Sequence, residues 1–413
     1  MSQLLNRRYQ QQTFLGRGAV ARVYAAIDTT KGTPCALKIF RRNTKRFFDN
    51  ELFVSRLINE LPETAGVPSL SHIVDYFVFF DESGPRSGGS TKSSSNEDKV
   101  RTSNLAAAGE VPRPVRRMCL VQPLLGASLP DVRETMALPA NDILRVLRQI
   151  VVGVGALHAA GIVHGDLSLD NCLCTRGLEG LTPAEVSVVI CDFDTAFVKA
   201  IGPRDDPRYL GTYSYRAPEA VIGELTEASD LWAIGSMIFE LTTGSYLFDF
   251  DDESSDEEDE PALGAEPDAC AEHGSDAESD SETESSDSAD STAFKPESQR
   301  SASYDPDDIR ARYQRQYEHL KMVQQVIGPP PRAFWARARE YYNKNGKLMY
   351  NPKLDPVSLR ELMHERAAGH LSAAECDALY DLMAAVLHWN PAARATAPQL
   401  LHLLDETQKK LGL

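Results

Sequence analysis

The spacing of the apolar residues changes along this chain, and this change limits the folds that the sequence can adopt. Before residue 125 the apolar residues lie in short runs bounded by Gly and rich in Val, Tyr and Phe, which is typical of strands. After residue 140 they recur at helical spacing, as in Ala140–Ala160, where Ile143 and Leu157 share one stripe. A β-rich part followed by a helical part predicts an α+β fold.

The individual elements follow from the same patterns. Strands are expected at Thr13–Leu15, Ala21–Asp28, Pro34–Phe40, His72–Phe80 and Met118–Leu125. Helices are expected at Asp49–Leu61, Ala140–Ala160, Ser229–Thr243, His319–Ile327 and Glu375–Leu387. We therefore expect one bilobal domain over residues 9–408, with a small β-rich lobe at 9–121 and a larger helical lobe at 126–408.

Two low-complexity segments interrupt this pattern. Residues 81–115 are rich in Gly, Ser and Pro, and residues 251–304 form an acidic, serine-rich block. Neither has enough apolar residues to offset the chain entropy lost on folding, so both are expected to be disordered insertions into the domain. The net charge of −17 is local, because 18 acidic residues lie within 251–290. The rest of the chain is near neutral, so we expect no direct binding of nucleic acid.

The composition also excludes several classes of protein. Seven cysteines at no metal-ligand spacing favour a reducing compartment over a disulfide framework. The start, MSQLLNRRYQQQ, lacks the apolar run of a signal peptide. The longest uncharged run, Gln149–Gly165, is better explained by amphipathic spacing than by a bilayer. We expect a cytoplasmic or nuclear protein that is not bound to a membrane, and the sequence gives no indication of its oligomeric state.

Three stretches carry candidate chemistry, and the first is the turn from Gly16 to Val23 between two predicted strands. Glycines let a turn approach a ligand closely, and their amides can bind phosphate oxygens. On turn chemistry alone, a simple tight turn is the commoner interpretation. The strand pattern continues past Val23, where a dinucleotide-binding unit would begin a helix, and this argues against a Rossmann fold.

The second stretch centres on Lys38, which lies among the apolar strand residues of Cys35–Phe40. A buried ammonium group needs an anionic partner, and Glu51, early in the next predicted helix, is a candidate. Taken in isolation, the stretch is also explained by an edge-strand lysine whose ammonium group extends to water.

The third stretch is rich in hard oxygen ligands. It reads HGDLSLDN from His164 to Asn171, and an apolar strand pattern ends in Asp192, 21 residues further on. Asp and Asn oxygens suit Mg²⁺, and Asp166 is a carboxylate able to accept a proton from a hydroxyl group.

Taken in order, these stretches resemble the eukaryotic protein kinases over essentially the whole chain outside the insertions. The shared set is the glycine loop, the strand lysine, the helix glutamate, H-x-D-L-x-x-x-N, D-F-x and A-P-E at Ala217-Pro218-Glu219. Each element alone is weak, but all six in order are specific. Asp230 is similar to the family's aspartate that holds the catalytic loop, and Arg394 to the arginine that pairs with the A-P-E glutamate.

The resemblance implies a bilobal kinase fold, ATP and Mg²⁺ as cofactors, and a Ser or Thr of a protein as the phosphate acceptor. Asp166 would orient and deprotonate the acceptor hydroxyl, and Lys38 would hold the α- and β-phosphates. The implied catalytic residues are Lys38, Asp166, Asn171 and Thr212. The implied metal ligands are Asn171 and Asp192. The implied nucleotide-binding residues are Leu15, Gly16, Gly18, Val23, Ala36, Lys38, Glu51, Pro123 and Leu125.

Two further likenesses narrow the expectation. Thr212 stands where Ser/Thr kinases contact the catalytic aspartate, which favours Ser or Thr over Tyr as the acceptor. Tyr215-Arg216-Ala217-Pro218-Glu219 is similar to the CMGC group of kinases. Residues 328–354 are loosely similar to the SR-protein and CLK-type kinases, which implies an Arg/Ser-rich protein substrate.

Four positions depart from the family pattern. Ala21 replaces the third glycine of the loop. Gly165 replaces the arginine before the catalytic aspartate, which removes the usual reason for a switch by phosphorylation. Ser168 replaces a lysine near the γ-phosphate, and Asp194 replaces the glycine of D-F-G.

These departures support a second hypothesis, a pseudokinase that serves as a scaffold with weak or no phosphotransfer. The retained groups favour the active enzyme, because they carry metal binding, positioning and proton acceptance. They are Lys38, Glu51, Asp166, Asn171 and Asp192.

Overall fold

A computed structural model describes most of the chain. It describes residues 4–62, 69–81, 115–206, 208, 210–249, 306–350, 352–367 and 369–413. The two predicted disordered insertions, 81–115 and 251–304, lie outside the described residues except for Asp81 and Val115. The chain divides into two compact units, and the larger one contains both predicted lobes.

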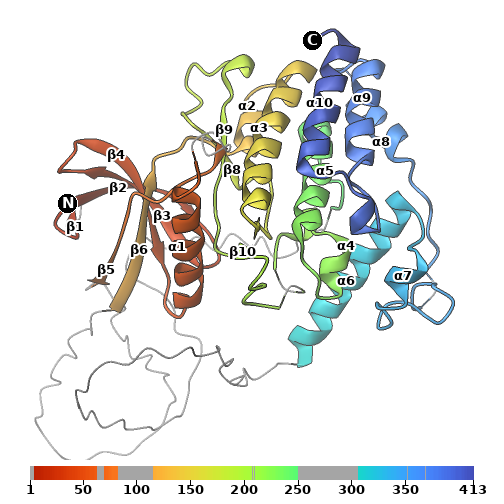
Figure 1. The fold of residues 1–413 in the computed structure, drawn as a ribbon, viewed down its shortest axis with the longest axis horizontal. Helices are drawn as coiled ribbons and strands as arrows, with labels where there is room; N and C mark the ends of the chain where they lie inside the picture. Colours follow the sequence, from red (N-terminus) through yellow and green to blue (C-terminus); the bar gives the residue numbers. More distant parts are fainter. Residues whose placement is uncertain are drawn as a thin grey trace, which may run out of the picture. The chain divides into compact units, whose positions relative to one another are not determined.

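The smaller lobe is built on a six-stranded sheet with the strand order β1-β2-β3-β4-β6-β5 (Figure 1). The strands are β1 (Leu4–Leu5), β2 (Tyr9–Arg17), β3 (Ala21–Asp28), β4 (Thr33–Phe40), β5 (Asp75–Asp81) and β6 (Val115–Pro123). Strands β1 to β4 pair antiparallel in sequence, and β6 pairs antiparallel with β4. Strand β3 has the predicted bounds, the ends of β2, β4, β5 and β6 differ from the prediction by up to four residues, and β1 was not predicted.

The alternation of β4 determines which of its side chains face the core. Cys35 and Leu37 belong to a cluster of buried residues on one face of the sheet, together with Tyr9. Phe40 belongs to a second cluster on the other face. Because side chains two residues apart share a face, Lys38 lies on the Phe40 side.

Helix α1 (Lys45–Asn59) covers this second face. Its Phe48 packs edge to face against Phe40, with 5.3 Å between the ring centroids. The helix begins four residues before the predicted start at Asp49 and ends two residues before Leu61. The buried Phe48 lies four residues before Leu52, so the apolar spacing extends into this first turn and the prediction began one turn too late.

The larger lobe is mainly helical. Its helices are α2 (Leu129–Thr135), α3 (Ala140–Ala159), α4 (Pro218–Val221), α5 (Glu227–Thr243), α6 (Pro306–Ile327), α7 (Arg332–Trp335), α8 (Leu359–Arg366), α9 (Ala373–Ala384) and α10 (Ala397–Leu411). Its short strands are β7 (Ile162–Val163), β8 (Cys172–Cys174), β9 (Val188–Ile190) and β10 (Phe197–Val198), and short 3₁₀ turns occur at η3 (Pro183–Glu185), η5 (Tyr213–Tyr215) and η6 (Pro391–Ala393). The predicted α+β fold with two lobes is confirmed.

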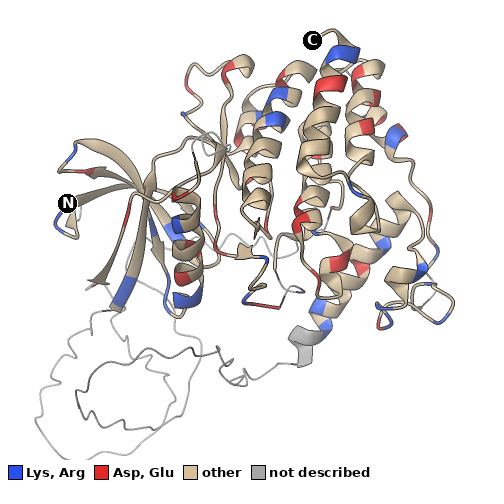
Figure 2. Cartoon of the chain, in the orientation of Figure 1, with Lys and Arg blue, Asp and Glu red and all other residues tan. Residues whose placement is uncertain are grey.

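Helix α5 is the centre of this lobe. It is buried over nearly its whole length, and its Trp232 is completely buried and stacks on Phe248. Helices α3, α8 and α9 contact it, and α10 contacts α3 and α9 (Figure 1). Figure 2 shows basic and acidic residues interspersed along the helices. In the described residues, no helix is both long and apolar enough to cross a membrane.

Three helices in this lobe extend beyond the predicted ranges, and α5 does so by two residues, since it begins at Glu227 and not at Ser229. Helix α6 was expected to begin at His319 but begins at Pro306, because its first turns are too rich in charged residues to show an apolar period. Helix α9 begins two residues before Glu375, where Ser372 and Glu375 form a capping box.

One titratable group lies in the core beside α5. His319 of α6 is completely buried, and its ring packs edge to face on Phe248. Burial and the nearby Arg216 charge lower the pKa of His319 to about 3. The folded protein therefore holds this imidazole neutral at pH values where the unfolded chain would protonate it.

This burial predicts an acid sensitivity that His319→Phe removes. Between pH 6.5 and 3 the unfolded state binds a proton at this position and the folded state does not, so stability falls as the pH falls. Relative to the variant, the wild type should lose roughly 2 kcal/mol of unfolding free energy between pH 6.5 and 4.5. Urea denaturation of both proteins across this pH range measures the difference. Unfolding free energies that change with pH by the same amount in both proteins would contradict the prediction.

Candidate functional site

Residues of β2, β3, β4, β8 and the segment after β6 line one large cavity of about 920 Å³. Eight of the nine predicted nucleotide-binding residues line it: Leu15, Gly16, Gly18, Val23, Ala36, Lys38, Pro123 and Leu125. The predicted metal ligands Asn171 and Asp192 line it as well. Glu51 does not, because it is completely buried behind the cavity residues Lys38 and Gln122, both of which it contacts.

The turn between β2 and β3 forms one wall of this cavity. The Gly18 N–H donates to the Ala21 carbonyl at 2.9 Å and closes the turn. A Cβ atom at Gly16 would meet no protein atom within 4 Å, so packing within the protein does not require glycine there. The missing side chain leaves room beside the backbone for a ligand. Ala21, which replaces the third glycine, is buried in the same cluster as Phe40, so its methyl group packs in the core.

Lys38 joins two carboxylates at the inner end of the cavity. Its Nζ lies 2.6 Å from Glu51 Oε2 and 2.6 Å from Asp192 Oδ1, and the lysine is 6% exposed. The predicted Lys38–Glu51 contact is confirmed. Burial alone would lower the pKa of Lys38, but the two carboxylates raise it well above its ordinary value. Burial raises the pKa of Glu51 to about 7, against the opposing effect of Lys38.

Asp192 adopts a left-handed backbone conformation with φ +66°, which is strained for a residue other than glycine. Burial opposes its ionisation, but the Lys38 ammonium holds the pKa of the Asp192 carboxyl below its ordinary value. Two residues on, burial and the Asp192 charge raise the pKa of Asp194 to about 8. Asp194 therefore adds a second, weakly acidic carboxyl group beside Asp192.

A buried carboxylate of α5 holds the loop that carries Asp166. Asp230 accepts hydrogen bonds from the backbone N–H groups of His164 and Gly165, both at 3.0 Å. Its Oδ2 also lies 2.8 Å from Nε2 of His158. Burial would raise the pKa of Asp230, but these partners lower it. The predicted support of this loop by Asp230 is confirmed.

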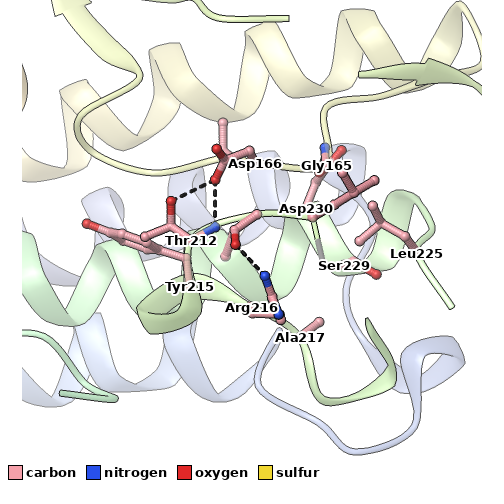
Figure 3. Close-up of a pocket in the computed structure, with 13 residues that line it drawn as sticks. Gly165, Asp166, Thr212, Tyr215, Arg216, Ala217, Leu225, Ser229 and Asp230 are labelled. Atoms are coloured by element: carbon pink, nitrogen blue, oxygen red, sulfur yellow. Dashed lines mark hydrogen bonds between the residues drawn. The ribbon is translucent and has the colours of Figure 1, made fainter. Parts of the chain in front are cut away.

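The Asp166 side chain is held by Thr212, the residue predicted to contact it (Figure 3). Its Oδ1 accepts hydrogen bonds from the Thr212 backbone N–H and from Thr212 Oγ1, both at 2.8 Å. Gly211, just before, has φ +80°, and its carbonyl accepts from Arg216 Nη2 at 2.5 Å. A Cβ atom on Gly211 would lie 2.8 Å from the Gly165 carbonyl oxygen, so glycine is required at this crossing.

The geometry of Asn171 suits a divalent metal ion. Its Nδ2 donates to the Asp166 carbonyl at 2.8 Å, which orients the amide and directs Oδ1 to the opposite side. Asn171 and Asp192 both line the cavity and offer hard oxygens. Within the described residues no three His, Cys, Asp or Glu side chains form a metal cluster. A metal ion held by Asn171 and Asp192 would therefore also need oxygen atoms from a bound molecule or water.

The substituted positions in this loop have local structural roles. The hydroxyl of Ser168 accepts from the Asn171 N–H at 3.3 Å, and the serine is buried. Ser168 therefore stabilises the loop backbone and provides no cation. Gly165 has φ +81°, and a Cβ atom there would lie 3.2 Å from Leu225. A side chain at residue 165 would be strained in this conformation.

The A-P-E glutamate is anchored to the other end of the lobe. Arg394 donates Nη1 to Glu219 Oε1 at 2.6 Å and Nη2 to Oε2 at 2.7 Å, and both side chains are almost fully buried. Ser229 also donates to Glu219 Oε1 at 2.9 Å. This bidentate pair confirms the predicted contact.

Sequence reasoning missed two residues that connect the site to its surroundings. Asn50 of α1 donates Nδ2 to the carbonyls of Asp194 and Ala196, at 2.9 and 2.6 Å. Gly126 follows the predicted cavity residue Leu125, and a Cβ atom there would lie 1.9 Å from the Arg176 carbonyl oxygen. A polar residue one position before Glu51 was a weak signal for Asn50, but nothing in the sequence indicated the crossing at Gly126.

Comparisons with known proteins agree with this arrangement. Residues 9–403 match the family model described as the protein kinase domain. A putative cyclin-dependent kinase F-2 of Oryza sativa subsp. japonica is 34% identical over 30% of this chain and 37% of that protein. Serine/threonine-protein kinases PknA of Corynebacterium glutamicum is 26% identical over 60% and 45%. Mitogen-activated protein kinase 12 of Rattus norvegicus is 25% identical over 58% and 54%. The chain thus spans between 37% and 54% of these relatives.

The Lys38 contacts predict a large effect of Lys38→Met on stability. The variant leaves Glu51 and Asp192 facing each other without their shared cation, which should lower the unfolding free energy by roughly 3–5 kcal/mol. Adding Glu51→Gln should restore part of this loss. Urea denaturation of the single and double variants measures both effects.

The matched control is Lys45→Met, which removes an exposed lysine of α1 that pairs with Asp49. Its unfolding free energy should stay within about 0.5 kcal/mol of the wild type. An equally small effect of Lys38→Met would contradict the proposed importance of the buried pair.

Proposed function

Because this chain belongs to the protein kinase family, with serine/threonine-protein kinases among its relatives, we propose that it transfers the γ-phosphate of ATP to Ser or Thr hydroxyls of proteins. The observation that most supports activity is the contact of Lys38 with both Glu51 and Asp192. In kinases the lysine–glutamate pair and the metal-binding aspartate must be in place together. The Lys38–Glu51 pair is formed, and Asp192, the proposed metal ligand, contacts the same ammonium group.

Asp166 is the proposed proton acceptor. Its Oδ1 is engaged by Thr212, so the carboxylate can present Oδ2 to an incoming hydroxyl group. This fixed geometry orients the acceptor oxygen toward the transferred phosphoryl group. The Asp166 carboxylate takes up the proton of the acceptor hydroxyl as the new bond forms. Thr212 acts through Asp166 and is therefore a positioning residue.

Lys38, Asn171 and Asp192 are the proposed contacts of nucleotide and metal. Mg²⁺–ATP supplies the transferable phosphoryl group, and the metal neutralises its charge. Asn171 Oδ1 and the Asp192 carboxylate would hold the metal, because both are hard oxygens on the wall of one cavity. Lys38 would contact the α- and β-phosphates while its pair with Glu51 fixes its position.

A pseudokinase scaffold is the alternative, and two observations favour it. The Ser168 hydroxyl is occupied by the loop backbone, so the cation expected near the γ-phosphate is missing from this position. Asp194 adds a carboxyl group where the family has glycine. The retained groups nevertheless favour the active enzyme, because the proposed positioning and proton acceptance depend on them and not on the substituted residues.

A phosphotransfer assay separates the two functions. The full chain is incubated with Mg²⁺, labelled ATP and a panel of Ser/Thr peptides, including Arg/Ser-rich ones, since we propose such proteins as substrates. Asp166→Asn should reduce transfer by about 10²-fold or more. Asp377→Asn, which removes a partly exposed carboxylate of α9, should leave transfer unchanged. Transfer no greater than that of Asp166→Asn on every peptide would favour the scaffold.

Nucleotide binding is tested separately from transfer. Mg²⁺–ATP at a hundred times its Kd should add about 2.7 kcal/mol of stability, because it binds only the folded state. We expect Tm to rise by several degrees in the wild type and in Asp166→Asn. The increase should be lost in Asp192→Ala. An unchanged Tm at millimolar Mg²⁺–ATP in the wild type would argue against nucleotide binding.

A further inference from the structure

The middle of the segment between Asp192 and Glu219, residues 196–208, contains no hydroxyl side chain, whereas Thr195, Tyr209 and Thr212–Tyr215 on either side of it do. Between Thr195 and Tyr209 the sequence reads AFVKAIGPRDDPR, with no Ser, Thr or Tyr. Two adjacent carboxylates, Asp205 and Asp206, occur in this stretch instead. A phosphate on residues 196–208 is therefore not available, and another negative group is needed if this stretch is to be held by charge.

The first of these carboxylates is bound to helix α1. Asp205 Oδ1 lies 2.8 Å from Arg46 Nη1, and the Asp205 side chain is 26% exposed. One helical turn further along α1, the buried Asn50 binds the carbonyls of Asp194 and Ala196. Helix α1 therefore holds the segment at two places, once near Asp192 and once at Asp205.

The second carboxylate and the following backbone are bound on the other side. Asp206 accepts from the backbone N–H and the guanidinium of Arg208. The Arg208 carbonyl accepts from Arg216 Nη1 and from Gln316 Nε2 of α6, both at 3.0 Å. Gln316 is buried, and its Oε1 accepts from the Tyr341 hydroxyl at 2.7 Å. The segment is thus fixed at Asp205 and Arg208, a few residues before Thr212.

The charges explain why a carboxylate suffices here. A phosphate carries about −1.5 to −2 charges and three acceptor oxygens, which suits a group of arginines. Gly165 replaces the arginine that would precede Asp166, and among the described residues Asp205 pairs with one guanidinium, that of Arg46. One carboxylate matches one guanidinium in charge.

We propose that Asp205, bound to Arg46, is a built-in negative charge that holds this segment in the arrangement where Thr212 contacts Asp166. Its position then does not depend on phosphorylation of the segment. The structural part of this proposal stands without the proposed kinase activity, and its effect on turnover rests on that activity.

The test compares Asp205→Asn with the charge-reversed pair Asp205→Arg and Arg46→Asp in the full chain. The primary measurement is amide hydrogen exchange of residues 197–212, which needs no activity. Since a half-exposed ion pair has a modest energy, Asp205→Asn should speed exchange about fivefold or less, and 0.5 M NaCl should reduce the difference. The double reversal should return exchange toward the wild type.

Asp49→Asn is the matched control, because it removes an α1 carboxylate that pairs with Lys45. Equal exchange in Asp205→Asn and Asp49→Asn would overturn the proposal, as would faster exchange of the wild-type segment after phosphatase treatment. Where transfer is measurable, Asp205→Asn should lower kcat/KM by a similar factor. Phosphatase treatment of the wild type should leave kcat/KM unchanged. Altered exchange in a protein that transfers no phosphate would support the proposal and reject the kinase function.

Discussion

A single buried ammonium group connects the sheet of the smaller lobe to the segment that carries Asp192. Lys38 comes from β4, Glu51 from α1 and Asp192 from the segment after β9, so the three can meet only when all these elements are in place. Removing charges from water costs free energy, which is recovered only with close contacts such as the two at 2.6 Å. The pair therefore makes the position of α1 a condition of the site's assembly.

Buried carboxylates perform the corresponding task in the larger lobe. Asp230 binds the backbone N–H groups of His164 and Gly165, and Glu219 binds Arg394. Each joins parts of the chain that are distant in sequence. Because an unpaired carboxylate in such a place would be costly, the correct loop arrangement is favoured over alternatives that leave the charge unmatched. The loop that carries Asp166 is thus held from behind by α5, away from the cavity.

The sequence predicted the lobes, the cavity residues and the ion pairs because each depends on a local pattern or an ordered motif. Strand β3 and helix α3 were located well, since their apolar periods extend to their ends. The start of α6 was missed because its first turns are rich in charged residues, and the start of α1 was placed one turn too late although Phe48 continues its apolar spacing. The contacts of Asn50 and Gln316 were not predicted, because a side chain that binds a distant backbone carbonyl leaves at most a weak signal in the sequence.

The crossing at Gly126 limits how the two lobes can separate. Its N–H donates to the Cys174 carbonyl at 2.7 Å, and its Cα lies too close to the Arg176 carbonyl to carry a side chain. The connecting chain is therefore fastened to the larger lobe directly after Leu125. Strand β6 runs as far as Pro123, whose ring restricts its own φ angle. A rotation of the smaller lobe about this short pivot would widen the outer edge of the cavity more than the end beside the linker.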